Sequence, residues 1–197
     1  MPWFAWADVP KIVRQANPFS LSFILLCLDV NRVEIRHLQG IKKVLGIMEN
    51  ESTTPEVLSA SSRTLSAILE DNDSFAMFNE LGGTKILLKL LSHEDTDVVS
   101  NIVETIGVTS RNESVIGVFK ELGTIQAITQ LLFINDLDML VQVLKTLCSI
   151  SKQESAHSEM IKYNVIDTVF KSVITNSSLE IRQEGFLLCS LLATQSM

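Results

Sequence analysis

Apolar residues recur along most of this chain at intervals of three and four, a spacing that predicts helices. The clearest stretch covers residues 82–110, GGTKILLKLLSHEDTDVVSNIVETIGVTS. Its pattern predicts a short helix, a polar corner (SHEDTD) and a second, longer helix. The same plan returns before and after this stretch, so the chain as a whole is expected to be a stack of similar helical units.

Residues that favour helix starts recur at nearly constant spacing. The side chains of Asp, Ser and Thr accept hydrogen bonds from amides that the first helical turn leaves unpaired. Such residues precede the four long helices, at intervals of 41, 41 and 42 residues: Thr54, Asp95, Asp136 and Ser178. Equivalent positions of the repeats are called a column. The column ten residues after the helix starts holds a small residue in three of the four repeats: Thr64, Thr105 and Thr146, with Leu188 in the fourth. Small side chains there predict a close approach of neighbouring long helices.

Two shorter helices are predicted before each long helix. Gly82, Gly123 and Asn164 stand 41 residues apart, where a left-handed residue would end one helix before the next begins. The segments FAMFNEL, VIGVFKEL and HSEMIKYN precede them. In the first unit, Gly40 is expected to end a short helix over 33–39. Three helices at a period of about 41 residues predict a stacked solenoid.

These residues resemble a known repeat family. The pattern G-x-I-x-x-I/L-x-x-L-L, a polar corner and E/D-V-x-x-x-A-x-x-A-L-x-x-L-A is similar to the armadillo repeat, best in GTIQAITQLL…DMLVQVLKTLCSIS and EIRQEGFLLCSLLA. HEAT repeats are the nearest alternative, but their Pro and Asp/Arg signature is not evident. The resemblance implies an all-α, right-handed solenoid of three-helix repeats. We expect one domain over 1–197, with repeats at about 33–70, 74–111, 114–152 and 157–195 and a degenerate repeat at about 8–31.

Both ends of the predicted solenoid are apolar. Trp3, Phe4 and Trp6 crowd the N-terminus, either as a lid over the core of the first repeat or as an exposed docking patch. The last helix, EGFLLCSLLATQSM, lacks the polar outer face that a terminal repeat normally has. We therefore expect either a longer array or a molecule, such as a second copy, on this end.

Composition narrows the class of partner and the compartment. The formal net charge is −7, with 16 Lys and Arg that form no cluster, so we expect no nucleic-acid surface. The most apolar run, FSLSFILLCL, is too short for a bilayer span of about 20 residues, so no membrane insertion is expected. Cys27, Cys148 and Cys189 are scattered and odd in number. They favour a reducing compartment, the cytoplasm or the nucleus.

No set of residues with catalytic or metal-binding spacing occurs. His37, His93 and His157 are far apart, and neither H-E-x-x-H nor C-x-x-C is present. Cys148 and Cys189 sit among Leu and Ile, which predicts buried thiols rather than nucleophiles. We expect no enzyme activity, no cofactor and no metal.

The armadillo resemblance implies that the third helices line a concave groove for extended peptides. In importin-alpha-like members an Asn column and a Trp column clamp the peptide. Here the Asn column holds Ala67, Val108, Ser149 and Leu191, and the Trp column holds Arg63, Glu104, Lys145 and Leu187. Because both columns are lost, a nuclear-localisation-signal receptor is disfavoured. The remaining polar positions are the candidate site: Arg63, Asn101, Glu104, Gln142, Lys145 and Glu184.

Two interpretations of these positions stay open. They form a mixed-charge groove that sets the register of a peptide, or a solvated face on which opposite neighbouring charges cancel. For the whole chain, the sequence favours a non-enzymatic scaffold or adaptor that binds a protein segment on the concave face or at the ends. The alternatives are a regulatory or exchange-factor-like subunit acting on a GTPase or chaperone through its convex surface or ends, and a structural spacer.

Overall fold

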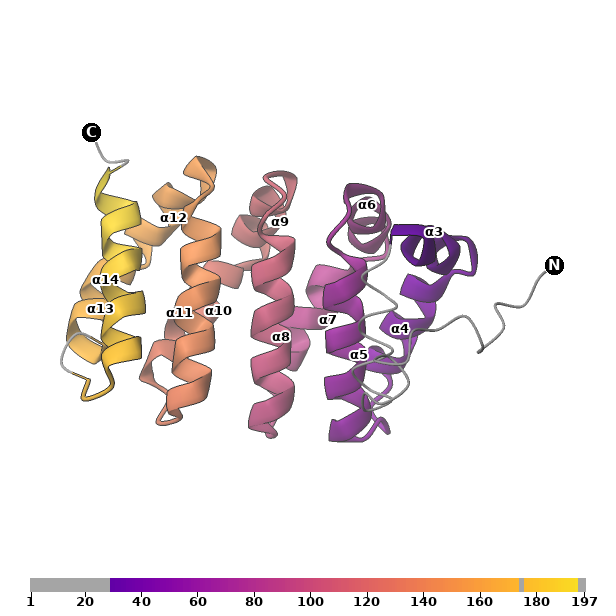
Figure 1. The fold of residues 1–197 in the computed structure, drawn as a ribbon, viewed down its shortest axis with the longest axis horizontal. Helices are drawn as coiled ribbons and strands as arrows, with labels where there is room; N and C mark the ends of the chain where they lie inside the picture. The colour runs from indigo at the N-terminus through magenta and orange to yellow at the C-terminus, as the bar shows by residue number, and fades with distance from the viewer. Residues whose placement is uncertain (1–28, 174–175, 195–197) are drawn as a thin grey trace, which may run out of the picture.

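A computed structural model describes residues 29–173 and 176–194 of the chain. Over these residues it contains twelve α-helices, two short 3-10 helices and no strand. The helices follow one another along a single long axis, with α3 near one end and α14 at the other (Figure 1). The predicted degenerate repeat and the Trp3, Phe4 and Trp6 cluster lie outside the described residues.

The helices come in groups of three, each ending in a long helix. The first group is α3 (Asp29–His37), α4 (Gly40–Glu49) and α5 (Pro55–Ile68), and the second is α6 (Asn72–Glu80), α7 (Gly83–Leu90) and α8 (Thr96–Thr109). The third is α9 (Ser114–Leu122), α10 (Thr124–Gln130) and α11 (Leu137–Ser151), with η2 (Leu131–Phe133) between the last two. The fourth is η3 (Glu154–Ala156), α12 (His157–Lys162), α13 (Val165–Ser172) and α14 (Leu179–Thr194).

The starts and ends of these helices follow the local chemistry of the sequence. The Asp95 carboxylate accepts from the amide of Val98 at 3.0 Å, and that of Asp136 accepts from the amide of Met139 at 2.9 Å. Gly82, Gly123 and Asn164 adopt φ values of 71°, 69° and 52°. The predicted caps and left-handed residues are therefore confirmed at these five positions.

The first group differs from the prediction at one residue. Gln39, with a φ of 55°, takes the left-handed position that we had assigned to Gly40, and Gly40 begins α4. A Cβ atom on Gly40 would collide with the side chain and carbonyl of Ile35. The glycine is needed for close packing between α3 and α4, which the sequence pattern does not distinguish from a need for positive φ.

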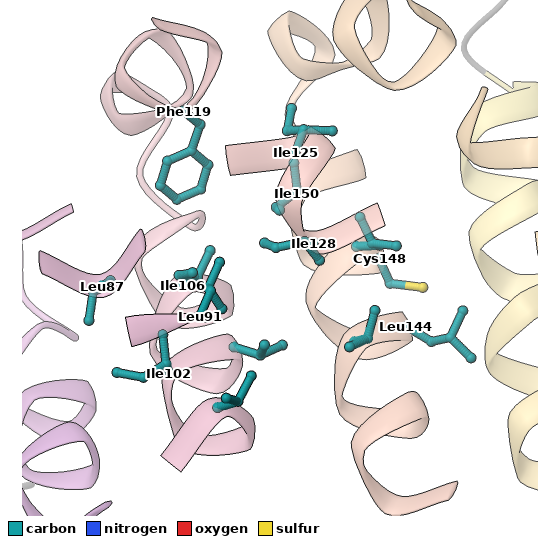
Figure 2. Close-up of a cluster of buried hydrophobic side chains, with 14 of the residues drawn as sticks. Leu87, Leu91, Ile102, Ile106, Phe119, Ile125, Ile128, Leu144, Cys148 and Ile150 are labelled. Atoms are coloured by element: carbon teal, nitrogen blue, oxygen red, sulfur yellow. The ribbon is translucent and has the colours of Figure 1, made fainter. Parts of the chain in front are cut away.

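One continuous apolar core runs through the stack. The first three long helices each contribute a residue with no exposed surface at the same position, Leu65, Ile106 and Leu147 in α5, α8 and α11. Phe78 of α6 and Phe119 of α9 are equally buried. Figure 2 shows Phe119, Ile106 and Ile128 converging from three different helices. Because each group shares its core with the next, the described helices form one body.

Candidate functional site

The long helices α5, α8, α11 and α14 stand side by side and form one row (Figure 1). Their solvent-facing side chains make up a surface that we call the third-helix face. It includes the six candidate positions: Arg63, Asn101, Glu104, Gln142, Lys145 and Glu184. The shape of this face depends on how the helices are held together.

Hydroxyl side chains join neighbouring long helices directly. The hydroxyl of Thr105 lies 3.2 Å from the carbonyl of Ser62 in α5 and 2.8 Å from that of Asn101 in its own helix. Thr146 donates its hydroxyl to the carbonyl of Val103 in α8 at 3.0 Å. Both threonines are fully buried. A Cβ atom on Gly107 would lie only 2.9 Å from the Thr146 hydroxyl. The small-residue column therefore allows the close helix approach that the sequence predicts, and it adds a hydrogen bond from one repeat to the next.

A second polar contact ties α8 to α11 near their C-terminal ends. Ser149 donates to the carbonyl of Gly107 at 3.0 Å and lies 2.9 Å from the hydroxyl of Ser110. Ser149 occupies the position of the asparagine that armadillo peptide receptors are expected to present. Its hydroxyl is engaged between repeats, so it stabilises the scaffold in place of offering an amide to a peptide.

The six candidate residues differ in exposure and in partners. Arg63, Glu104 and Lys145 are exposed, whereas Asn101, Gln142 and Glu184 are partly buried. Lys145 pairs with Glu180 of α14 at 3.4 Å, and Asn101 donates to the carbonyl of Asp97 in its own helix at 2.7 Å.

Neither Arg63 nor Glu104 lies within ion-pair distance of an opposite charge in the part of the chain that the structure describes. Of these three exposed charges, only that of Lys145 is therefore paired with an opposite charge among the described residues. Its partner is Glu180, not Glu104.

A hollow of 520 Å³ lies between α5 and α8 on the third-helix face. Arg63 and Asn101 line it, together with residues that sequence reasoning left out: Pro55, Glu56, Ser59, Ala60, Asp95, Asp97 and Ser100. Glu56 and Asp97 lie in the first turns of α5 and α8, where a carboxylate also interacts favourably with the helix dipole. Hydrogen bonds from its own backbone amide and from Thr54 lower the pKa of Glu56, so it is a carboxylate at neutral pH. With three carboxylates and one guanidinium, the hollow is net negative.

A second hollow, of 440 Å³, lies between α4, α7 and the loop before α5. Its floor includes Met48, Leu58 and Leu90, and its rim carries an ion pair between Lys89 and Glu51 at 3.1 Å. The sequence signal for this hollow is a longer second helix, since α4 has 10 residues and α7 has 8. The left-handed residue and the following N-cap are 15 residues apart in the first group (Gln39 to Thr54) but 13 in the second (Gly82 to Asp95).

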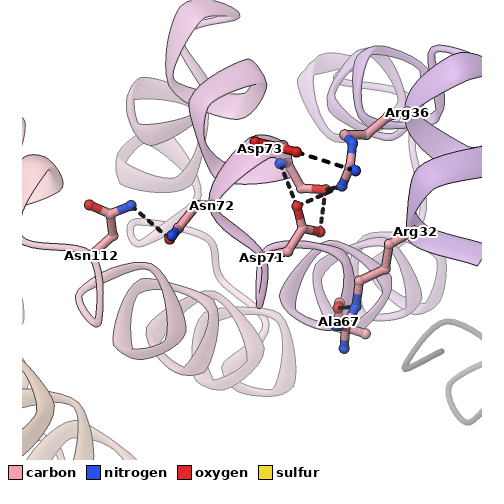
Figure 3. Close-up of polar contacts among 8 residues, drawn as sticks. Arg32, Arg36, Ala67, Asp71, Asn72, Asp73 and Asn112 are labelled. Carbon is pink, nitrogen blue, oxygen red and sulfur yellow. Dashed lines mark hydrogen bonds and ion pairs between the residues drawn. The ribbon is translucent and has the colours of Figure 1, made fainter. Parts of the chain in front are cut away.

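Arginines of α3 connect this helix to the end of α5 and to the start of α6 in the second group. Arg36 bonds Asp71, the N-cap of α6, at 2.6 Å and the hydroxyl of Ser74 at 2.9 Å (Figure 3). Arg32 is buried, and it donates to the carbonyl of Ala67 at 3.1 Å and pairs with Glu70. These charges are engaged within the scaffold, so we do not assign them to partner binding.

His93, His157 and Cys148 make contacts within the scaffold. The amide of Asp95 donates to Nδ1 of His93, and Nε2 of His157 lies 2.6 Å from the carbonyl of Ser151. Burial, with a smaller contribution from Glu184, raises the pKa of the Cys148 thiol to about 12. This thiol stays protonated at neutral pH and is a poor nucleophile.

The described residues hold neither a cluster of metal-ligating side chains nor a membrane-spanning helix. Within residues 29–173 and 176–194, no three His, Cys, Asp or Glu side chains gather as metal ligands would. In the same residues, no helix combines the length and apolar character that a bilayer crossing needs.

The fold is similar to that of designed armadillo repeat proteins. One of these, YIII(Dq)4CqI, superposes with a TM-score of 0.76 at 14% identity, covering 92% of this chain and 79% of the designed one. Another, solved in complex with the peptide (KR)4, gives a TM-score of 0.78 at 15% identity, covering 93% and 81% of the two chains. A third, described as designed for modular peptide recognition, gives 0.77 at 14% identity, with 92% and 79% covered.

No protein-family model and no curated protein sequence matches the chain. The structural likeness nevertheless defines the fold: the chain is an armadillo-like helical repeat protein, an all-α solenoid, as predicted from its sequence. At 14–15% identity the comparison shows the architecture alone. Any role for the third-helix face has to be argued from the residues of this chain.

Proposed function

We propose that the chain is a non-enzymatic scaffold or adaptor that binds an extended segment of a partner protein along the third-helix face. The observation that carries the proposal is the row α5, α8, α11 and α14, which presents exposed charges beside a hollow of 520 Å³. A designed protein of the same architecture holds the peptide (KR)4, so the fold is compatible with this kind of ligand.

The charges on this face favour a segment with basic side chains near α5 and α8. Glu56, Asp95 and Asp97 line the hollow together with a single cation, Arg63. Glu104 of α8 is exposed and has no ion-pair partner among the described residues. A Lys or Arg of the partner would pair with these carboxylates. Arg63 would pair with an acidic residue next to it in the partner segment, and the two pairs together would fix the register of the segment along the face. Because the face is open to solvent, such pairs contribute selectivity more than affinity.

The proposed site residues are the six candidate positions, and the proposed compartment is the cytoplasm or the nucleus. The compartment rests on three scattered cysteines in the sequence and on the buried Cys148 thiol. The repeat boundaries predicted from the sequence, about 33–70, 74–111, 114–152 and 157–195, are the units in which we expect partner contacts to recur.

Charge reversal tests the site. The triple variant Arg63→Glu, Glu104→Lys, Lys145→Glu changes the third-helix face. A matched control, Lys42→Glu, Glu121→Lys, Lys171→Glu, makes the same change in net charge at exposed positions on α4, α9 and α13. Peptides of about ten residues selected by display on the native protein should bind the control as well as the native chain and lose at least about tenfold in affinity for the site variant. Equal binding to both variants would rule out this face.

A second candidate function rests on the hollow between α4 and α7. Its apolar floor and charged rim suit a protruding side chain of a folded partner, as a regulatory subunit for a GTPase or chaperone would require. This function predicts that no short peptide suffices for binding. It also predicts that Lys85→Glu with Lys89→Glu weakens capture of the folded partner, whereas the third-helix variant does not.

A further inference from the structure

The outer surface of α14 carries side chains at positions that are buried in every preceding long helix. Equivalent residues follow from the helix starts, which are 41, 41 and 42 residues apart. Ser62, Val103 and Leu144 have no exposed surface, whereas Phe186, at the same position in α14, is 54% exposed. The same contrast holds for Leu69, Ser110 and Ser151, which are buried, and Ala193, which is exposed.

These positions are the ones that contact the next helix in the stack. The carbonyls of Ser62 and Val103 accept the hydroxyls of Thr105 and Thr146 from the following long helix. Cys148, one turn further along α11, donates its thiol to the carbonyl of Glu184 in α14 at 3.8 Å. Its equivalent in α14, Ser190, is exposed. The outer surface of α14 therefore continues an interface that forms three times within the chain.

The residues that continue it form one stripe, which we call the end face: Arg182, Phe186, Ser190 and Ala193. They follow each other at intervals of four, four and three residues, so they share one side of the helix. Phe170 of α13 lies in the adjacent layer and is also exposed, whereas Thr129, its equivalent in α10, is buried. The end face carries no acidic residue, although the chain has a net charge of −7.

The end face is complementary to itself. Its N-terminal half is bulky, with Arg182 and Phe186, and its C-terminal half is small, with Ser190 and Ala193. In an antiparallel pair related by a two-fold axis, each Phe186 would face the small residues of the other helix. Each Arg182 would lie near the C-terminal end of the other α14, where the helix dipole favours a cation. A parallel arrangement would place Phe186 against Phe186 and offer no such match.

We propose that the end face is an isologous dimer interface, in which α14 packs antiparallel against α14 of a second copy. A two-fold pair closes on itself and yields a dimer, whereas a head-to-tail contact would yield open chains. The interface is one helix pair flanked by Phe170 and is small by the standards of stable dimers, so a micromolar dissociation constant is expected.

The first experiment measures mass against concentration. Sedimentation velocity on the full chain, from about 1 to about 300 µM, should show a shift from 21.9 kDa to twice that mass. Phe186→Asp should raise the dissociation constant at least about 30-fold, since it places a charge at the centre of the interface. Ser190→Arg should do the same, because the larger side chain fills the space left by the small residues. Phe133→Asp is the control, because Phe133 is 68% exposed and lies in η2, outside the end face. Circular dichroism checks that each variant remains helical.

Three outcomes would overturn the proposal. The native chain could remain monomeric throughout the range, the end-face variants could dimerise like the control, or the mass could rise past the dimer without limit. A cross-link tests the geometry separately. An equimolar mixture of Phe186→Cys and Ser190→Cys should form disulfide-linked dimers, because these two positions face each other in the antiparallel pair, and a mixture of Phe133→Cys and Ser190→Cys should not. Neither Phe186 nor Ser190 belongs to the proposed peptide site, so peptide binding by the end-face variants separates failure of this proposal from failure of the proposed function.

Discussion

The bond from Thr146 to the carbonyl of Val103 allows a sharp test of how the repeats are joined. Thr146→Val keeps the shape of the side chain and removes the hydroxyl that spans α11 and α8 at 3.0 Å. A neutral hydrogen bond contributes about 1 kcal/mol net to stability. The added methyl group offsets part of this loss, since Thr146 is 1% exposed and its surroundings are apolar. We expect the free energy of unfolding to fall by about 0.5 to 1 kcal/mol, which corresponds to roughly 1–4 °C in the melting temperature.

Thr129→Val is the matched control for this variant. Thr129 is also buried, but its hydroxyl bonds the carbonyl of Ile125 in its own helix at 2.6 Å. Removing such a local bond has little effect on helix stability, so the control should melt within about 1 °C of the native chain. Urea unfolding followed by circular dichroism measures both. If Thr146→Val is as stable as Thr129→Val, the hydroxyls between repeats do not hold the long helices together.

Two further predictions concern a helix cap and a buried thiol. Asp136→Ala should lower the free energy of unfolding by about 1 kcal/mol in urea titrations, because it leaves the amide of Met139 without its cap. The control Asp138→Ala, in the exposed first turn, should lower it by about half as much or less. Equal losses in the two variants would contradict the assignment of Asp136 as the cap. Burial raises the pKa of the Cys148 thiol from 9.0 to about 12, so the stability that its protonated form provides is complete below pH 9 and is lost as the pH rises towards 12. Urea titrations from pH 8 to 10.5 should show a decline of at most about 1.4 kcal/mol per unit above pH 9 that Cys148→Ala removes; an unchanged decline in the variant would assign it to other groups.

The sequence predicts most of the scaffold because the repeat makes each signal appear several times. A single Gly or Asp is weak evidence of a helix boundary, but Gly82, Gly123 and Asn164 at one interval support each other. The first group departs from that interval, and there the prediction placed the left-handed residue at Gly40 when it is Gln39. Pattern alone cannot tell a glycine that is needed for positive φ from one that is needed where two helices touch.

The candidate site was less predictable because side-chain partners depend on offsets between helices. In the sequence, Lys145 falls in one column with Glu104, which suggests that their charges cancel. In the structure Lys145 reaches diagonally to Glu180 in the first turn of α14, and Glu104 is left without an ion pair among the described residues. The same limit applies to Ser149, whose engagement with Gly107 and Ser110 follows from the close approach of α8 and α11.

The two hollows differ in whether the sequence carries a signal for them. The hollow between α4 and α7 coincides with a second helix that is two residues longer than its counterpart, a signal that is readable in the sequence once the repeat is aligned. The hollow between α5 and α8 has no such signal, because it is formed by small residues, Ser59, Ala60 and Ser100, at positions where a repeat tolerates many side chains. From the sequence alone, its acidic residues Glu56, Asp95 and Asp97 are recognised only as residues typical of helix starts.

Peptide affinity of the charge-reversed site variant and of its matched control tests most directly whether the third-helix face binds an extended protein segment. Fluorescence anisotropy with a display-selected peptide compares the native chain, the variant Arg63→Glu, Glu104→Lys, Lys145→Glu and the control Lys42→Glu, Glu121→Lys, Lys171→Glu. We predict that affinity falls at least about tenfold in the first variant and is unchanged in the second. Equal affinity in all three proteins, with their helical content intact, would contradict it.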